Sequence, residues 1–196
     1  MSPRLGLTRD RVIDAAIEIA DEQGAATPTL AQVAARLGVR APSLYNHVAG
    51  LDDLRHALTL RALDELGRRL QAAAVGRSGA DALRAMAGAY RAFAAQRPGL
   101  AAATVPTTEV DDPEIRRAGA EILATLLAGL SAFGLRDDEA IHAARALRSA
   151  IYGFVTIERA GGFGLPEDVD HSFRWMIDRL IAALEAGGGR AAAGGR

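Results

Sequence analysis

The side chains best suited to chemistry lie in the segment 40–47, RAPSLYNH. Spacings of three or four residues place four polar side chains on one outward face of a short helix, namely Arg40, Ser43, Asn46 and His47. Tyr45 lies at the edge of this face. In the DNA major groove, arginine binds guanine O6 and N7 and asparagine binds adenine N6 and N7. Hydroxyl groups and the N–H groups at helix starts suit phosphates. Since no Asp or Glu occurs between Gln23 and Leu51, this face predicts contact with double-stranded DNA.

Two short helices with a tight turn between them, over residues 29–50, are expected to hold this face. Thr29 with Gln32 has the spacing of a capping box, and Gly38 follows the apolar stripe where a helix ends in a left-handed residue. Pro42 fits the first turn of the second helix, whose inner side is formed by Leu44 and Val48. This arrangement is typical of a helix-turn-helix, although a helical hairpin with a merely solvated polar face has the same spacing.

Residues 8–24 and 29–50 resemble the amino-terminal domain of the tetracycline-repressor (TetR) family of bacterial regulators. The resemblance rests on Ala15-Ala16, Gly24, Thr29, the run from Val33 to Val39, and above all Leu44-Tyr45-Asn46-His47-Val48. It favours the helix-turn-helix over the solvated hairpin. The residues expected to contact DNA are Thr29, Arg40, Ala41, Pro42, Ser43, Tyr45, Asn46 and His47.

One departure from the family occurs at the start of the next helix. The family usually has a Lys there that helps to hold phosphate, whereas this chain has Leu51-Asp52-Asp53. Two acids near DNA would repel it, so the phosphate contact at this point is in doubt.

The whole chain is expected to be all-α, with about nine helices and no strand. Helices are expected over residues 8–24, within 29–50, and over 52–74, 80–96, about 100–104, 113–133, 137–160 and 167–186. The predicted domains are a DNA-binding domain over 1–50, a ligand-binding and dimerisation domain over 51–186, and a disordered tail over 187–196. The tail prediction follows from its sequence, GGGRAAAGGR.

The second half resembles a carboxy-terminal class of the same family named after a Trp-His-Gly (WHG) motif. The match includes Arg148-Ser149-Ala150, Glu158 and Gly162-Phe163, but Ile151-Tyr152 replaces Trp-His and only Gly153 is kept. The resemblance implies an unknown small-molecule effector, for which the expected lining is Met86, Tyr90, Phe93, Leu127, Arg145, Tyr152 and Thr156. It also implies a homodimer on a palindromic operator, with an interface from Ile151, Val155, Phe173, Ile177, Leu180 and Leu184.

Composition excludes several other classes of protein. The chain has no Cys, a net charge of −1, and no apolar run longer than the 14 residues of 122–135, which is too short to span a bilayer. A cytoplasmic protein with no membrane partner is expected. None of the four histidines has a partner at metal-ligand spacing and no strand precedes a glycine loop, so no catalytic residue, metal or cofactor is expected. The remaining alternative is a helical small-molecule-binding dimer without DNA recognition.

Overall fold

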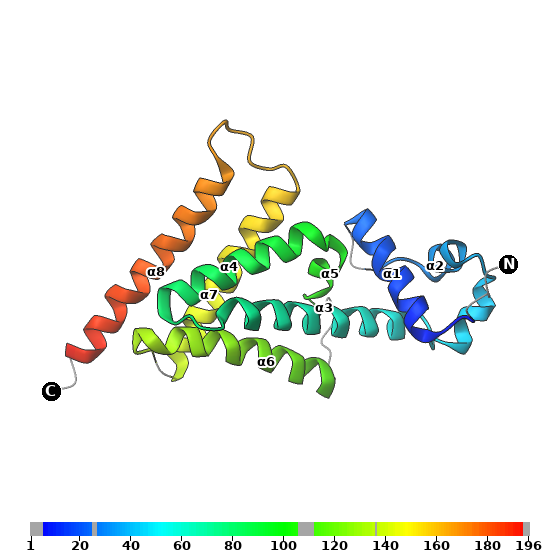
Figure 1. Ribbon diagram of the computed structural model, residues 1–196, viewed down its shortest axis with the longest axis horizontal. Helices are drawn as coiled ribbons and strands as arrows, with labels where there is room; N and C mark the ends of the chain where they lie inside the picture. Colours follow the sequence, from blue (N-terminus) through cyan, green and yellow to red (C-terminus); the bar gives the residue numbers. More distant parts are fainter. Residues whose placement is uncertain (1–5, 25–26, 106–111, 136, 194–196) are drawn as a thin grey trace. The chain divides into compact units, whose positions relative to one another are not determined.

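The computed structural model describes residues 6–24, 27–105, 112–135 and 137–193, and these residues contain helices and turns without any strand (Figure 1). The all-helical prediction is therefore confirmed. The elements are α1 (Arg9–Gln23), α2 (Leu30–Leu37), the 3₁₀ helix η1 (Ala41–Asn46), α3 (Leu51–Ala74), α4 (Gly79–Gln96), α5 (Pro98–Ala103), α6 (Pro113–Leu130), the 3₁₀ helix η2 (Ser131–Phe133), α7 (Asp137–Arg159) and α8 (Val169–Ala193).

By their own contacts the residues group into two units. The first unit comprises Met1–Glu65 and Gln96–Ala118, and the second comprises Leu66–Ala95 and Gly119–Arg196. The helix-turn-helix thus shares its unit with α5 and the first residues of α6. The domain boundary after residue 50, expected from the sequence, stays a prediction.

The helices of the first unit start and stop at local signals. The Thr8 hydroxyl accepts the Arg11 N–H at the start of α1, and Gly24 ends α1 in the left-handed region at φ 64°. Thr29 and Gln32 form the predicted capping box of α2, which ends at Gly38 with φ 67°. The predicted inner stripe of α1 is buried: Val12, Ala15, Ala16 and Ile19.

Helix α5 packs on α1 and receives its N-terminal cap from α1. The Asp21 carboxylate accepts the Gly99 and Leu100 N–H groups at 2.8 and 3.3 Å, so a side chain 78 residues away occupies the usual capping position. The Arg97 Nε donates to the same carboxylate at 2.6 Å. Gly99 is required here, because a Cβ at this position would lie 2.3 Å from the Ala20 carbonyl carbon.

In the second unit, α4 is held from several sides. Its Met86 and Leu83 side chains lie against Gly129 of α6, and the Arg69 guanidinium of α3 covers the Phe93 ring at 5.2 Å. Helices α7 and α8 contact each other and form an antiparallel pair joined by the loop near Gly161 (yellow to orange in Figure 1). Arg84 of α4 donates to Asp178 of α8 at 2.8 Å.

Two helix ends differ from the sequence expectation. The last three residues of the predicted helix over 113–133 form η2, which closes with Gly134 at φ 73°. Helix α8 continues to Ala193, although an end at residue 186 was expected from the following glycines. The residues after those glycines, Arg190 and alanines 191–193, are strong helix formers. No single helix among the described residues is both long and apolar enough to cross a membrane.

Candidate nucleic-acid interface

The predicted DNA-contact face lies on η1 and is held from beneath by buried apolar residues. Leu44 and Val48 are fully buried, whereas Tyr45 is 59% exposed and Arg40, Pro42 and Asn46 are exposed. Ala41, Ser43 and His47 are half-buried, and Thr29 is exposed at the start of α2. All eight predicted positions therefore belong to α2 and η1 or directly adjoin them.

This segment is a 3₁₀ helix rather than the α-helix that the sequence predicted. The Ser43 N–H donates to the Arg40 carbonyl at 2.9 Å and the His47 N–H to the Leu44 carbonyl at 2.8 Å, which are bonds between residues three apart. With six residues, η1 is longer than the three or four that are usual for a 3₁₀ helix, and a proline stands in its first turn. The outward positions of Tyr45 and Asn46 are kept.

Arg9 compensates the acid at the start of α3. Its two terminal nitrogens donate to the Asp53 carboxylate at 2.8 and 2.7 Å, and one of them also donates to the His47 carbonyl at 2.9 Å. Asp53 accepts the Ala49 N–H at 2.8 Å as well. The Arg9 hydrogen bonds, aided by that from Ala49, lower the pKa of Asp53 to about 2.

The Arg9–Asp53 ion pair changes the charge at the position where the family usually has a lysine. Asp53 does not present an isolated charge toward a ligand, because Arg9 binds it bidentately. Its neighbour Asp52 is exposed and pairs with Arg55 at 2.9 Å. Sequence patterns did not reveal the Arg9–Asp53 pair, since the two residues are 44 positions apart and lie on different helices.

The positive charge of α2 is also compensated within the unit. Arg36 pairs with Glu22 and Glu18 of α1, and the hydrogen bond that it donates to Glu22 raises the pKa of Arg36. Arg40 forms an ion pair with none of the residues that the structure describes. The interface is therefore an array of exposed hydrogen-bonding groups with one uncompensated arginine, which suits base contacts better than broad phosphate attraction.

A separate groove of about 780 Å³ lies in the second unit, between α4, α7 and α8. Its uncharged lining consists of Gly88, Ala92, Ala95, Val155, Phe173 and Ile177. Its charged lining consists of Arg84, Arg91, Glu158, Arg159, Arg174 and Asp178. A volume of this size is within the range of small-molecule sites.

Arg91 organises one end of this groove. It pairs with Glu158 of α7 and, at 2.7 Å, with Asp170 of α8, and these bonds, led by that to Glu158, raise its pKa. Its guanidinium also lies 4.9 Å from the centre of the Phe173 ring. The residue thus ties α4 to both α7 and α8, a role that no local sequence pattern indicated.

The predicted effector residues lie elsewhere in the second unit. Met86 and Phe93 are buried core residues, Tyr90 and Leu127 are half-buried, and Arg145, Tyr152 and Thr156 are exposed. None of the seven lines the groove. Their selection from the sequence relied on residue type, whereas the groove depends on the register of three helices.

Of the predicted dimer residues, Val155, Phe173 and Ile177 are buried within the unit itself and line the groove. Ile151, Leu180 and Leu184 are half-buried. The largest exposed apolar side chain of α8 is Trp175, at 60% exposure, which the sequence prediction did not include. Its spacing from the buried stripe places it on another side of the helix.

Comparison with known proteins identifies the family. A family model described as "Tetracyclin repressor-like, C-terminal domain" matches residues 83–180. The chain is 38% identical over 180 residues to the uncharacterised HTH-type transcriptional regulator Rv0681 of Mycobacterium tuberculosis, covering 91% of this chain and 82% of that one. It belongs to the TetR family of transcriptional regulators.

Other comparisons agree with this assignment. YobS of Bacillus subtilis, an uncharacterised HTH-type transcriptional regulator, is 35% identical over 185 residues, covering 94% of this chain and 96% of its own. The crystal structure of a single-residue variant of TetR from Acinetobacter baumannii in complex with minocycline matches with a TM-score of 0.67 and 28% identity, over 92% of this chain and 98% of that one. The matched family and the curated relatives are transcriptional regulators rather than enzymes, so the predicted class is confirmed.

Proposed function

We propose that this TetR-family regulator is a cytoplasmic repressor that binds a palindromic operator as a homodimer. The observation that carries the DNA-binding part is the exposed face of Arg40, Tyr45 and Asn46. This face belongs to a helix-turn-helix whose α2 is capped and whose inner side is buried. Such a short helix, braced by the helix before it, suits insertion into the major groove. A two-fold symmetric protein would meet two half-sites about one helical turn apart, which favours a palindrome.

The test is selection of operator sequences from random duplex DNA by the purified protein at a stated salt concentration. A two-fold symmetric consensus is expected. Asn46→Ala should weaken binding to the selected site about 5- to 150-fold, the equivalent of 1–3 kcal/mol for a base contact, and relax preference at one position in each half-site.

Arg117→Ala is the matched control, because Arg117 is an exposed arginine on α6, outside η1. It should leave both affinity and consensus unchanged. If Asn46→Ala and Arg40→Ala bind the same DNA as the wild type, the predicted face is wrong; if no sequence is enriched, the alternative of a ligand-binding dimer without DNA recognition gains support.

The groove of the second unit supports binding of an effector. Its apolar lining includes the buried Val155, Phe173 and Ile177, whereas Arg159 and Arg174 are exposed. Arg174 is 3.7 Å from Asp168, and Arg159 pairs with none of the described residues. These features favour a small molecule with an apolar body and an anionic group. The minocycline complex of the Acinetobacter neighbour supports effector binding in this family without identifying the effector here.

Gly88→Leu tests this part of the proposal. No atom outside its own helix lies within 4 Å of a Cβ at Gly88, so the larger side chain should fill the groove without a clash. The variant should still bind the selected DNA but lose release by a cellular metabolite extract. Equal release of the variant and the wild type would exclude the groove as the effector site.

A further inference from the structure

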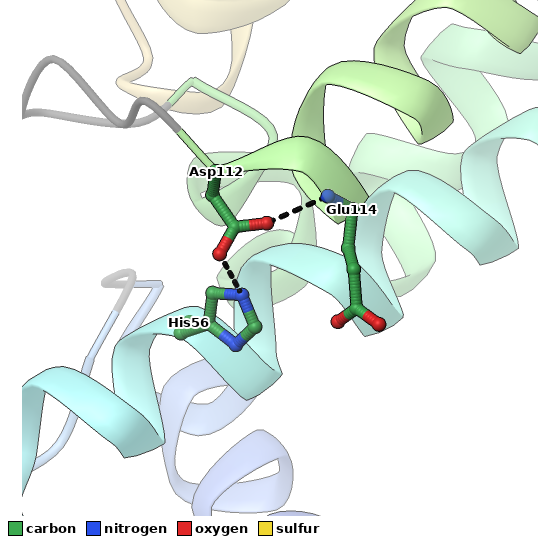
Figure 2. A group of neighbouring side chains, drawn as sticks. All are labelled: His56, Asp112 and Glu114. Carbon is green, nitrogen blue, oxygen red and sulfur yellow. Dashed lines mark hydrogen bonds and ion pairs between the residues drawn. The ribbon is translucent and has the colours of Figure 1, made fainter.

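Three potential metal ligands converge in the first unit where α6 begins beside α3. His56 comes from α3, Asp112 directly precedes α6, and Glu114 lies in the first turn of α6 (Figure 2). One ligand atom from each of the three lies within 4.8 Å of the other two. No sequence pattern indicated this group, because His56 and Asp112 are 56 positions apart.

The Asp112 carboxylate is fixed in place by the backbone. One oxygen accepts the Glu114 and Ile115 N–H groups at 2.8 and 3.1 Å. The other oxygen lies 2.9 Å from the Nε2 atom of His56. Side-chain exposures of 29% and 27% for His56 and Asp112 leave the pair accessible to ions while limiting its motion.

The spacing is suited to a first-row transition-metal ion. Ligand distances of about 2.1 Å put two neighbouring donor atoms about 3.0–3.4 Å apart, close to the 2.9 Å between Nε2 of His56 and the Asp112 carboxylate. Glu114 is exposed and unbranched, so rotation of its side chain can bring its carboxylate inward by the remaining distance of about 1–2 Å. His56 and Asp112 alone would be enough for an ion pair. The carboxylate of Glu114 adds the third ligand that a metal site needs.

The donor chemistry limits the metal. One imidazole with two carboxylates suits Zn²⁺, Mn²⁺ or Ni²⁺ better than Mg²⁺ or Ca²⁺, which prefer oxygen ligands alone. Thiolate ligation is excluded because the chain has no cysteine. We propose that His56, Asp112 and Glu114 bind one divalent first-row transition-metal ion and thereby join α3 to α6 within the first unit.

Calorimetric titration of ZnCl₂ into the untagged, EDTA-treated full chain tests this site. One ion per chain is expected. His56→Gln keeps an N–H donor for Asp112 but removes the imidazole, and Asp112→Asn keeps a residue that caps helices well. Each of these substitutions, and Glu114→Gln, should weaken Zn²⁺ binding at least about tenfold.

His142→Gln is the matched control, since His142 is exposed on α7 in the second unit and should not affect Zn²⁺ affinity. Metal-free melting curves of all variants should match that of the wild type, which separates ligation from folding. Absence of Zn²⁺ binding, equal affinity of His56→Gln and the wild type, or equal competition by Mg²⁺ would overturn the proposal. Because no DNA is present, the result is independent of the proposed regulatory function.

Discussion

At the scale of single residues, charge in the first unit is largely used to join helices. Arg9 joins α1 to the start of α3, Arg36 joins α2 to α1, and Arg97 joins α5 to α1. Exposed pairs of this kind stabilise proteins little, but Arg9–Asp53 is bidentate and supplemented by backbone hydrogen bonds. It should therefore contribute more than the exposed pair of Asp52 with Arg55.

Asp53→Asn tests that contribution. The pKa of Asp53 in the folded protein is about 2, below its ordinary value of 3.8, so ionised Asp53 stabilises the fold above about pH 4. We expect the substitution to cost about 1–2 kcal/mol at pH 7, after allowance for the exposed Arg9 partner, and the difference from wild type to vanish as the pH falls toward 2.

Urea unfolding of both proteins between pH 7 and 2 measures this difference. Asp52→Asn is the control, because the Asp52 side chain is 95% exposed, and it should cost under about 0.5 kcal/mol. A cost for Asp53→Asn that is the same at pH 7 and pH 2 would show that the ion pair is not its source.

At the scale of helices, the chain illustrates which features can be predicted from sequence. The Thr29–Gln32 capping box and the Gly24 and Gly38 stops were predictable, because each depends on residues a few positions apart. The capping of α5 by Asp21 was not, because it depends on how α1 and α5 pack. The groove was not predictable either, because it depends on the packing of three helices. The 3₁₀ form of η1 depends on a small difference in free energy between alternative backbone hydrogen bonds.

Gly99→Ala tests the close packing of α5 on α1. The new methyl group would lie 2.3–2.5 Å from backbone and side-chain atoms of Ala20 and Asp21, so α5 must move and loosen its cap. We expect a loss of about 3 kcal/mol or more, corresponding to a fall in melting temperature of about 6–12 °C.

Gly119→Ala is the control for that experiment. Gly119 lies within α6 with no described atom within 4 Å of a Cβ beyond the helix's own backbone, so alanine should stabilise by about 0.5–1 kcal/mol. Calorimetric melting of both variants gives the comparison. A Gly99→Ala protein that melts like the wild type would contradict the described packing.

At the scale of the whole molecule, the proposed homodimer requires an apolar surface not already used inside the chain. Val155, Phe173 and Ile177 are buried in the second unit, so exposed residues of α8 become better candidates. Trp175 is the strongest, because exposed tryptophans are often central to protein interfaces. The sequence prediction placed the interface on α7 and α8, and the pattern of apolar residues could not show which of them are buried inside the unit.

Trp175→Glu should raise the dimer dissociation constant at least about tenfold. The substitution removes a large apolar contact, and it places a negative charge from each copy in the interface. Sedimentation equilibrium over a range of protein concentrations measures the change. Val75→Glu is the control: Val75 is 75% exposed beyond the end of α3, and its substitution should leave the dimer intact. Equal dissociation constants for Trp175→Glu and the wild type would remove Trp175 from the interface.

The dependence of α5 on Asp21 also bears on how such regulators can exchange parts. The first unit is not continuous in the sequence, since Gln96–Ala118 belongs with Met1–Glu65. A recombination event, or an engineered chimera, that replaced only residues 1–50 would supply a foreign α1 to the resident α5. The Asp21 cap and the Ala20 contact with Gly99 would then come from different parents. A chimera is therefore expected to acquire the operator preference of its donor most readily when the α5 segment is exchanged together with the helix-turn-helix.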